Sequence, residues 1–279
     1  MYALNKAQLI GYLTEDPNIR QTPAGQSVGD LNIVTKNYYT DSSGEQKTSQ
    51  SFHNVVIWRG LADIAGRFLK KGSQVYIAGR AQTDEWEDQK TGQKRYKTRI
   101  TADDMIILDP KNPNAPLSPE SKVAGGLNQA EIIGNLTRDP ETRQTPNGAT
   151  VSSFSVATNY TWKDRSGETQ EKTEFHNVVA WGDLAKSIGE TVKKGRKVYV
   201  SGRLQTRSWD TPEGNKRYTT EIISENVLAL GVPDADLGTP ASNSVASEAP
   251  VPTPAAPQNT SEVPPINYES EIKPEDLPF

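Results

Sequence analysis

The first 230 residues contain one sequence pattern written twice, the second copy displaced by 123 positions. Asp16-Pro17 returns as Asp139-Pro140, and the run 52–56, Phe-His-Asn-Val-Val, returns unchanged at 175–179. Solenoid repeats have periods of roughly 20–50 residues, so this longer period indicates a duplicated domain of about 100 residues. Two copies of one binding surface on one chain suit a ligand that is itself repetitive, such as a polymer.

Charge and composition divide the chain into four segments. The copies, 1–109 and 128–230, each carry 14 basic and 13 acidic side chains. Between them, 110–127 is rich in Pro and Gly, which predicts a semi-stiff linker. The last segment, 231–279, has ten Pro and one Lys against eight acidic residues, which predicts a disordered acidic tail. The tail therefore accounts for the net charge of −4.

Several classes of protein are disfavoured by what the chain lacks. It has no Cys, no run of apolar residues long enough for a membrane span, no apolar leader and no glycine loop of the phosphate-binding type. Its two histidines, His53 and His176, occupy equivalent positions of separate copies, and we expect each to be a neutral residue of the core. We therefore expect a soluble cytoplasmic protein that is not an enzyme, with no cofactor, metal site, catalytic residue or membrane partner.

The sequence predicts that each copy consists mostly of β-strands. Apolar alternation and turn residues in the first copy predict strands at 8–13, 28–35, 50–58, 75–86 and 96–107. Between the third and fourth strands, helical spacing predicts a short helix, with an apolar face of Leu61, Ile64, Ala65 and Phe68, and of Leu184, Ile188 and Val192 in the second copy. This is the plan of an OB-fold, although spacing alone also allows another small barrel. The predicted fold is all-β: two tandem five-stranded OB-fold barrels and a disordered C-terminal tail.

One sheet face of each copy is predicted to combine aromatic rings with arginines. Alternation along the third and fourth strands places these side chains opposite the Val and Ile residues of the core. The members are Phe52, Trp58, Arg80 and Trp86 in the first copy, and Phe175, Trp181, Arg203, Arg207 and Trp209 in the second. Aromatic rings offer platforms for bases and arginines offer partners for phosphates, so the pattern favours single-stranded nucleic acid.

A hairpin after the second strand is predicted to extend this face. In the second copy it carries Trp162 flanked by Lys163 and Arg165, whereas the first copy has Tyr39 and lacks the cations. Asp84 also stands where the second copy has Arg207. We hypothesise that the two copies bind with unequal strength, the second being the stronger.

The C-terminal tip carries a second indication of function, which is docking to a partner protein. Acidic residues surround the apolar ending, which can dock into a basic-rimmed hydrophobic pocket of a partner while cations capture the terminal carboxylate. The alternative is a tail that serves solubility, for which a terminal Phe has no use. The predicted docking residues are Asp276, Leu277, Pro278 and Phe279.

Taken together, these motifs closely resemble those of bacterial single-stranded DNA-binding proteins. The matching runs include Ile-Gly-Asn-Leu at 133–136, Thr-Glu-Phe-His at 173–176, Arg-Tyr-Thr-Thr-Glu at 217–221 and the ending Asp-Leu-Pro-Phe. The resemblance implies stacking positions at Tyr39, Phe52, Trp58, Trp86, Trp162, Phe175, Trp181 and Trp209. It also implies the subclass with two OB-folds per chain, a homodimer with four OB-folds, and a nucleoid-associated protein that binds and protects single-stranded DNA. The resemblance further implies that the tip recruits replication, recombination and repair proteins.

Two other classes remain open on the residues alone. One is an RNA-binding OB-fold protein, because nothing in the sequence reads the 2′-hydroxyl group. The other is a protein scaffold in which the aromatic faces form an oligomer interface. An enzyme is the third and weakest alternative.

Overall fold

A computed structural model describes residues 3–40, 44–87, 92, 94–109, 126–164, 166–210 and 216–231. The predicted linker, except for Gly126 and Leu127, lies outside the described residues, and so does the predicted tail with its docking tip, except for Gly231. No helix among the described residues is long and apolar enough to span a membrane.

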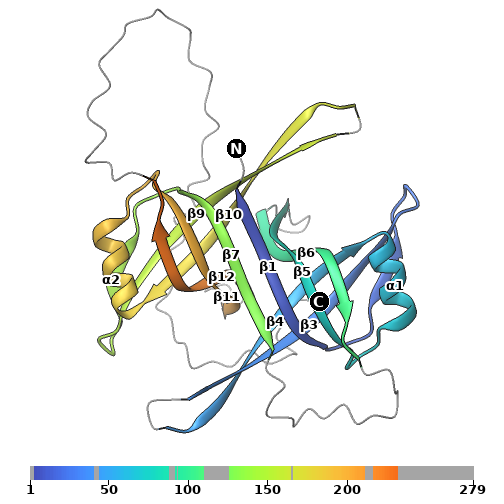
Figure 1. The fold of residues 1–279 in the computed structure, drawn as a ribbon, viewed down its shortest axis with the longest axis horizontal. Coiled ribbons are helices and arrows are strands. Elements are labelled where there is room, and N and C mark those ends of the chain that lie inside the picture. Colours follow the sequence, from blue (N-terminus) through green and yellow to red (C-terminus); the bar gives the residue numbers. More distant parts are fainter. Residues whose placement is uncertain are drawn as a thin grey trace, which may run out of the picture. The chain divides into compact units, whose positions relative to one another are not determined.

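The two copies fold into the same series of elements (Figure 1). The first contains β1 (Leu4–Leu13), β2 (Asn18–Gln21), β3 (Ser27–Thr40), β4 (Gln46–Trp58), α1 (Gly60–Phe68), β5 (Gln74–Glu87) and β6 (Lys94–Ile107). The second contains β7 (Leu127–Leu136), β8 (Glu141–Gln144), β9 (Thr150–Lys163), β10 (Thr169–Trp181), α2 (Gly182–Thr191), β11 (Lys197–Asp210) and β12 (Lys216–Ala229). The predicted strands of the first copy correspond to β1, β3, β4, β5 and β6, and each observed strand contains the predicted one and is longer than it. The short strands β2 and β8 were not predicted.

Strand pairing closes each copy into a five-stranded barrel. In the first copy, β1 pairs with β3, β3 with β4, β4 with β6, β6 with β5, and β5 with β1 again. The β4–β6 link is parallel and joins Val55 to Ile100, whereas the other links are antiparallel. The second copy repeats the circuit with β7, β9, β10, β12 and β11. The OB-fold prediction is therefore confirmed.

The two barrels share a strand ladder. β1 pairs with β7 in antiparallel register, from Leu4 opposite Ile133 to Ile10 opposite Leu127. β1 and β7 lie side by side in Figure 1, and residues 1–230 form one compact unit. Leu127, the last residue of the predicted linker, is thus already part of β7.

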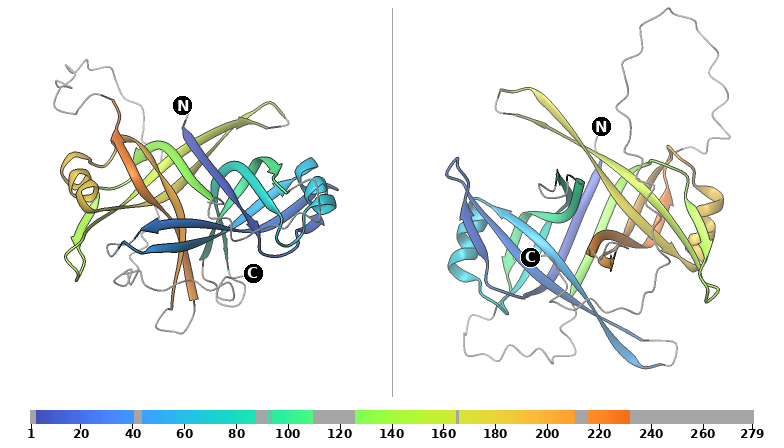
Figure 2. Two further views of the ribbon diagram at one scale, coloured as in Figure 1. Left: turned by 60° about the horizontal axis from the view of Figure 1, so that its bottom comes forward. Right: turned by 180° about the vertical axis from the view of Figure 1, so that it is seen from behind.

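Long hairpins leave each barrel. The β3–β4 and β9–β10 hairpins project beyond the barrels to which they belong (Figure 1 and Figure 2). Their pairing continues to Thr40 opposite Gln46 and to Lys163 opposite Thr169. These are the hairpins in which the sequence predicts additional binding residues.

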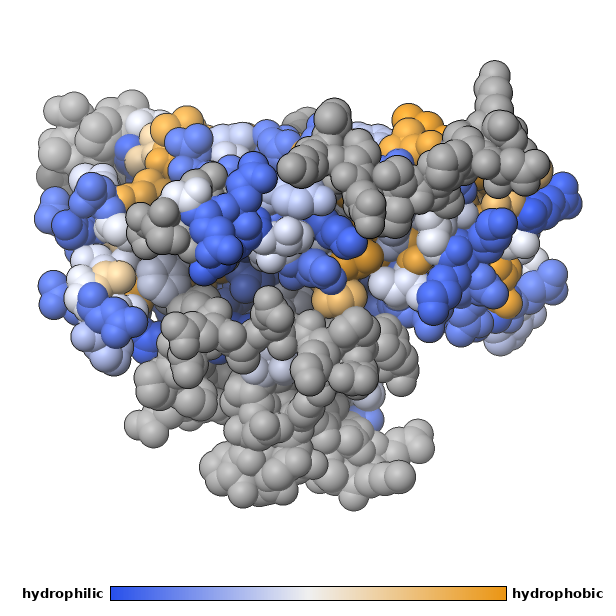
Figure 3. All heavy atoms as spheres, turned by 90° about the horizontal axis from the view of Figure 1, so that it is seen from below, coloured by the Kyte–Doolittle hydropathy of each residue, from blue (hydrophilic) through white to orange (hydrophobic). Residues whose placement is uncertain are grey.

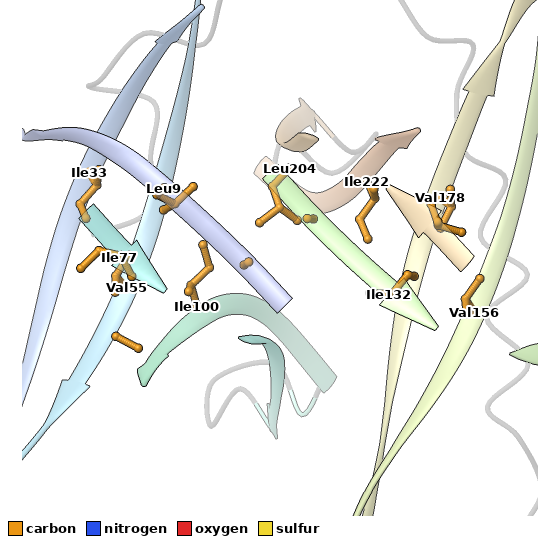
Figure 4. Close-up of a cluster of buried hydrophobic side chains, with 14 of the residues drawn as sticks. Leu9, Ile33, Val55, Ile77, Ile100, Ile132, Val156, Val178, Leu204 and Ile222 are labelled. Carbon is orange, nitrogen blue, oxygen red and sulfur yellow. The ribbon is translucent and has the colours of Figure 1, made fainter. Parts of the chain in front are cut away.

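The cores follow the predicted alternation along the strands. Figure 4 shows buried apolar residues gathered inside each barrel: Leu9, Ile33, Val55, Ile77 and Ile100 in the first, and Ile132, Val156, Val178, Leu204 and Ile222 in the second. All of these side chains are buried. Because neighbours along a strand point to opposite sides, the intervening side chains face away from the core.

The predicted apolar face of the first helix is partly wrong. α1 buries Ala62 and Ala65, whereas Ile64 is exposed and Phe68 is 66% exposed. α2 buries Ala185 and Ile188 at the positions equivalent to Ala62 and Ala65. Ala65 is buried and Leu61 packs against the core, so the predicted face is right at these two residues and wrong at Ile64 and Phe68.

Paired strands approach each other so closely at Gly79, and at the equivalent Gly202, that a side chain would not fit. A Cβ on Gly79 would lie 2.2 Å from the carbonyl oxygen of Thr101, and one on Gly202 would lie 2.1 Å from that of Ile223. The register between the paired strands shifts at both points, which marks a bulge. Only glycine fits where the backbones approach so closely.

Both histidines are buried in the barrels. His53 Nε2 lies 3.1 Å from Thr35 Oγ1, and His176 Nε2 lies 2.9 Å from Thr158 Oγ1. Burial disfavours the charged imidazolium and lowers the pKa of each histidine to about 4. Both are therefore neutral at pH 7, as the sequence predicts.

Because both histidines are buried, we expect the free energy of unfolding to decrease as the pH is lowered. Below pH 6.5 the unfolded chain binds protons at both histidines, while the folded chain does not until the pH approaches about 4. Between pH 7 and pH 5 we expect a loss on the order of 2 kcal/mol per histidine in the unfolding free energy. The measurement is denaturant unfolding at each pH, with the His53→Gln/His176→Gln variant as control. If the variant keeps the same pH dependence, the histidines are not its source.

Candidate nucleic-acid interface

The predicted binding face of the first barrel contains a groove of about 360 Å³. β4, β5 and β6 and the turn after β4 line it, and Trp58 at the end of β4 is 42% exposed beside it. The charged lining residues are Arg59, Arg80, Arg99, Asp84 and Asp103. The groove therefore combines an accessible aromatic ring with three guanidinium groups, of which Arg80 was predicted from the sequence.

Carboxylates hold two of these three arginines. Arg80 donates to Asp103 at 2.6 Å, and Arg99 donates to Asp84 and lies 4.0 Å from Asp30. No hydrogen bond or ion pair of the Arg59 side chain occurs within the described parts of the chain. Arg59 thus presents the least neutralised positive charge of the groove.

The second barrel has the equivalent ion pair with its charges exchanged. Arg207 on β11 donates from Nε and Nη2 to the two oxygens of Glu221 on β12, at 3.1 and 3.0 Å. The equivalent residues of the first barrel are Asp84 on β5 and Arg99 on β6. The cross-strand attraction is present in both barrels, but the strand that carries the cation differs. Arg207, predicted as a binding residue, is therefore engaged with a buried carboxylate.

The aromatic residues of the two barrels differ in exposure. Trp181, the equivalent of Trp58, is half-buried and packs against Val151, Val179 and Ile223. Phe175 on the same strand is 60% exposed and points away from buried His176. The second barrel therefore presents Phe175 more openly than Trp181.

The β9–β10 hairpin approaches the first barrel. The ring of Tyr160 stacks on that of Trp162 at a centroid distance of 5.5 Å, and the Arg80 guanidinium lies over the Tyr160 ring at 5.2 Å. The backbone N–H of Thr83 also donates to Glu174 on β10, at 3.0 Å. Tyr160 was not among the predicted site residues. The sequence could have indicated Tyr160, because it lies two positions before the predicted Trp162 and residues two apart on a strand share a face.

The remaining predicted residues fall into two groups. Trp86 and Lys163 are exposed on β5 and β9, Phe52 is half-buried on β4, and Arg203 donates to Gln205 at 2.9 Å on β11. The backbones of Tyr39 and Trp209 belong to β3 and β11, but their side chains lie outside the description, as does all of Arg165. The docking residues Asp276, Leu277, Pro278 and Phe279 lie outside it too.

Arg59 was missed by the sequence analysis although it lines the groove. Its backbone is left-handed, with φ 53° and ψ −126°, and among the described residues other than glycine it alone has a positive φ. The equivalent residue of the second barrel is Gly182, with φ 61°. A left-handed backbone costs a residue with a side chain on the order of 1–2 kcal/mol, and glycine avoids this cost.

One face of the molecule shows the general character of its surface. The face shown in Figure 3 is hydrophilic over most of its described area, interrupted by separate hydrophobic groups. No cluster of three or more metal-ligating side chains occurs among the residues that the structure describes. The geometry is that of a binding surface in which rings and guanidinium groups alternate on sheet faces.

The fold and these faces define a protein with tandem OB-fold barrels and paired aromatic and basic surfaces. The model of the single-strand binding protein family matches twice, at residues 4–108 and 127–230. The chain therefore belongs to the single-strand binding protein family, which confirms the resemblance and supports a binding protein rather than an enzyme.

Relatives are similar to this chain over most of its length. A single-stranded DNA-binding protein of Thermus aquaticus is 34% identical over 78% of this chain and 81% of its own length. One from Deinococcus radiodurans is 32% identical over 91% of this chain and 82% of its own length. The crystal structure of the wild-type Thermus aquaticus protein matches 85% of this chain and 98% of its own, with a TM-score of 0.64 and 28% identity.

The exchanged ion pair predicts a stability effect that is separate from binding. Replacing Arg207 with Met leaves Glu221 as a buried charge without its guanidinium, and we expect a loss on the order of 3 kcal/mol in the unfolding free energy. The Arg207→Met/Glu221→Met variant should recover most of this loss, as measured by denaturant unfolding. A double variant as unstable as the single one would contradict the pairing.

Proposed function

We propose that this protein binds and protects single-stranded DNA, without strong sequence preference, on the aromatic and basic faces of its two barrels. The observation that carries the proposal is the exposure of Trp58, Trp86, Trp162 and Phe175 on the strands, outside cores that are filled mainly by aliphatic residues. Trp58 lines one groove together with three arginines. Exposed aromatic rings on a sheet face are unusual unless a ligand covers them. The names of the relatives, which are single-stranded DNA-binding proteins, support the same ligand.

The chemistry favours a single strand over a duplex. Unpaired bases expose their ring faces, and stacking on an aromatic side chain contributes about 1–3 kcal/mol per base. A duplex covers these faces inside its own stack and offers mainly phosphates. Arg80 and Arg207 are paired with carboxylates in the free protein, so they are less available to bind phosphates. Stacking of bases on the aromatic rings therefore contributes a larger share of the proposed affinity.

Tryptophan fluorescence during titration with oligo(dT) tests the proposal. We expect strong quenching by the single strand and little response to a duplex of the same length at the same salt concentration. The Phe175→Ala variant should bind oligo(dT) about tenfold more weakly, because one stacking platform is lost.

The matched control for that variant is Phe68→Ala, which removes an equally large exposed ring from α1, away from the sheet face. Its affinity should equal that of the wild type. An equal response to duplex and single strand, or equal losses in both variants, would refute the proposed face. Tighter binding of oligo(U) than of oligo(dT) would favour the RNA-binding alternative.

We also propose a homodimer, which would bring four OB-folds together. Its support is an apolar outer face on the shared sheet: Ile10, Tyr76 and Ile106 are register partners in one row, and Ile133, Tyr199 and Leu228 in the equivalent row. Ile106 is 49% and Leu228 54% exposed. A second copy of the chain could cover both rows.

The dimer proposal is tested by sedimentation. The wild type should have twice the chain mass of 30.6 kDa, and the Ile106→Glu/Leu228→Glu variant should have the mass of one chain at the same concentration. The matched control is Ile64→Glu/Phe68→Glu, which alters the exposed apolar residues of α1 and should leave the mass doubled. A wild type that sediments as one chain would refute the dimer.

Two expectations stay predictions from the sequence. One is recruitment of replication, recombination and repair proteins by Asp276–Phe279, which lie outside the described residues. The other is a cytoplasmic, nucleoid-associated location, which would follow from binding to chromosomal DNA.

A further inference from the structure

The turn between β4 and α1 holds an arginine in a conformation that suits glycine. Both barrels need a left-handed residue at this turn, since φ is 53° at Arg59 and 61° at Gly182. Glycine meets that need in the second barrel without strain. Packing gives no reason for the arginine, because Arg59 is exposed. A side chain kept in a strained backbone conformation points to a role in function.

The Arg59 side chain lies beside the exposed ring that the proposed function uses. It lines the same groove as Trp58 and Arg80. Arg80 is held by Asp103, and Arg99 by Asp84, whereas Arg59 has no such partner within the residues described. Three arginines against Asp84 and Asp103 give the lining an excess of one positive charge, which Arg59 supplies.

We propose that Arg59 is a phosphate-binding residue of the first barrel alone. Its guanidinium contacts the backbone phosphate next to the base that stacks on Trp58. The planar guanidinium donates two parallel hydrogen bonds, which match two phosphate oxygens. This inference rests on the proposed binding of single-stranded DNA and names a contact that the second barrel, with Gly182, cannot make.

The contact makes the two barrels unequal in a way that the sequence analysis did not foresee. The second barrel was expected to bind more strongly because of Lys163 and Arg165 in its hairpin. The first barrel has Arg59, which lines the groove and has no carboxylate partner among the residues that the structure describes. Each barrel therefore combines the shared aromatic face with a cation of its own.

The test compares the full-length wild type with Arg59→Gly in oligo(dT) titrations over a series of salt concentrations. We expect affinity to fall about tenfold at low salt, as for the loss of one charged hydrogen-bonded contact. The slope of log affinity against log salt should become shallower by about 0.7, the value for one phosphate contact on a single strand. The thermal midpoint should be equal to or higher than that of the wild type, because the substitution relieves the strained backbone.

The matched control is Arg67→Ala, which removes the same charge from the last turn of α1, outside the groove. Its affinity and salt slope should stay close to those of the wild type. Unchanged binding by Arg59→Gly, an equal loss in Arg67→Ala, or a loss accompanied by a lower thermal midpoint would overturn the assignment. A wild type that does not bind oligo(dT) would instead refute the proposed function, and this inference with it.

Discussion

The antiparallel ladder between β1 and β7 fixes the position of one barrel relative to the other. Its main-chain hydrogen bonds run from Leu4–Ile133 to Ile10–Leu127 and extend the sheet of one barrel into that of the other. The β9–β10 hairpin consequently reaches the first barrel, where Tyr160 meets Arg80 and Glu174 accepts from Thr83. The linker was expected to act as a tether, but the ladder makes the relative position of the barrels part of the fold.

Duplication preserved the backbone plan and let the charges diverge. Both barrels bridge the same two strands with a carboxylate and a guanidinium, but Asp84 and Arg99 carry the opposite charges to Arg207 and Glu221. An ion pair is equally attractive with its partners exchanged, so the contact between these strands requires opposite charges but does not fix which strand carries the cation. At the turn after β4 the divergence has a backbone cost, because Arg59 adopts the positive φ that Gly182 adopts without strain.

Much of the fold could be predicted because strand alternation is a local property. The alternation correctly placed His53 in the core and Phe175 on the outer face. The helix face could be predicted only in part: Ala65 of the predicted apolar face is buried, but Phe68 of the same face is exposed, and Ala62, outside that face, is buried. Hydrophobic spacing identifies a helix, but the space beneath it decides which stripe is buried.

The sequence by itself determined the duplication, the all-β plan, the strand faces and the family, because each of these is encoded in spacing and local alternation. Only the tertiary structure decided which groove arginines pair with carboxylates, and which one has no such partner in the described part of the chain. Those outcomes depend on register across β5 and β6, which brings Arg80 to Asp103 and Arg99 to Asp84. Register is set by the simultaneous burial of distant segments, and no single stretch of sequence contains that information.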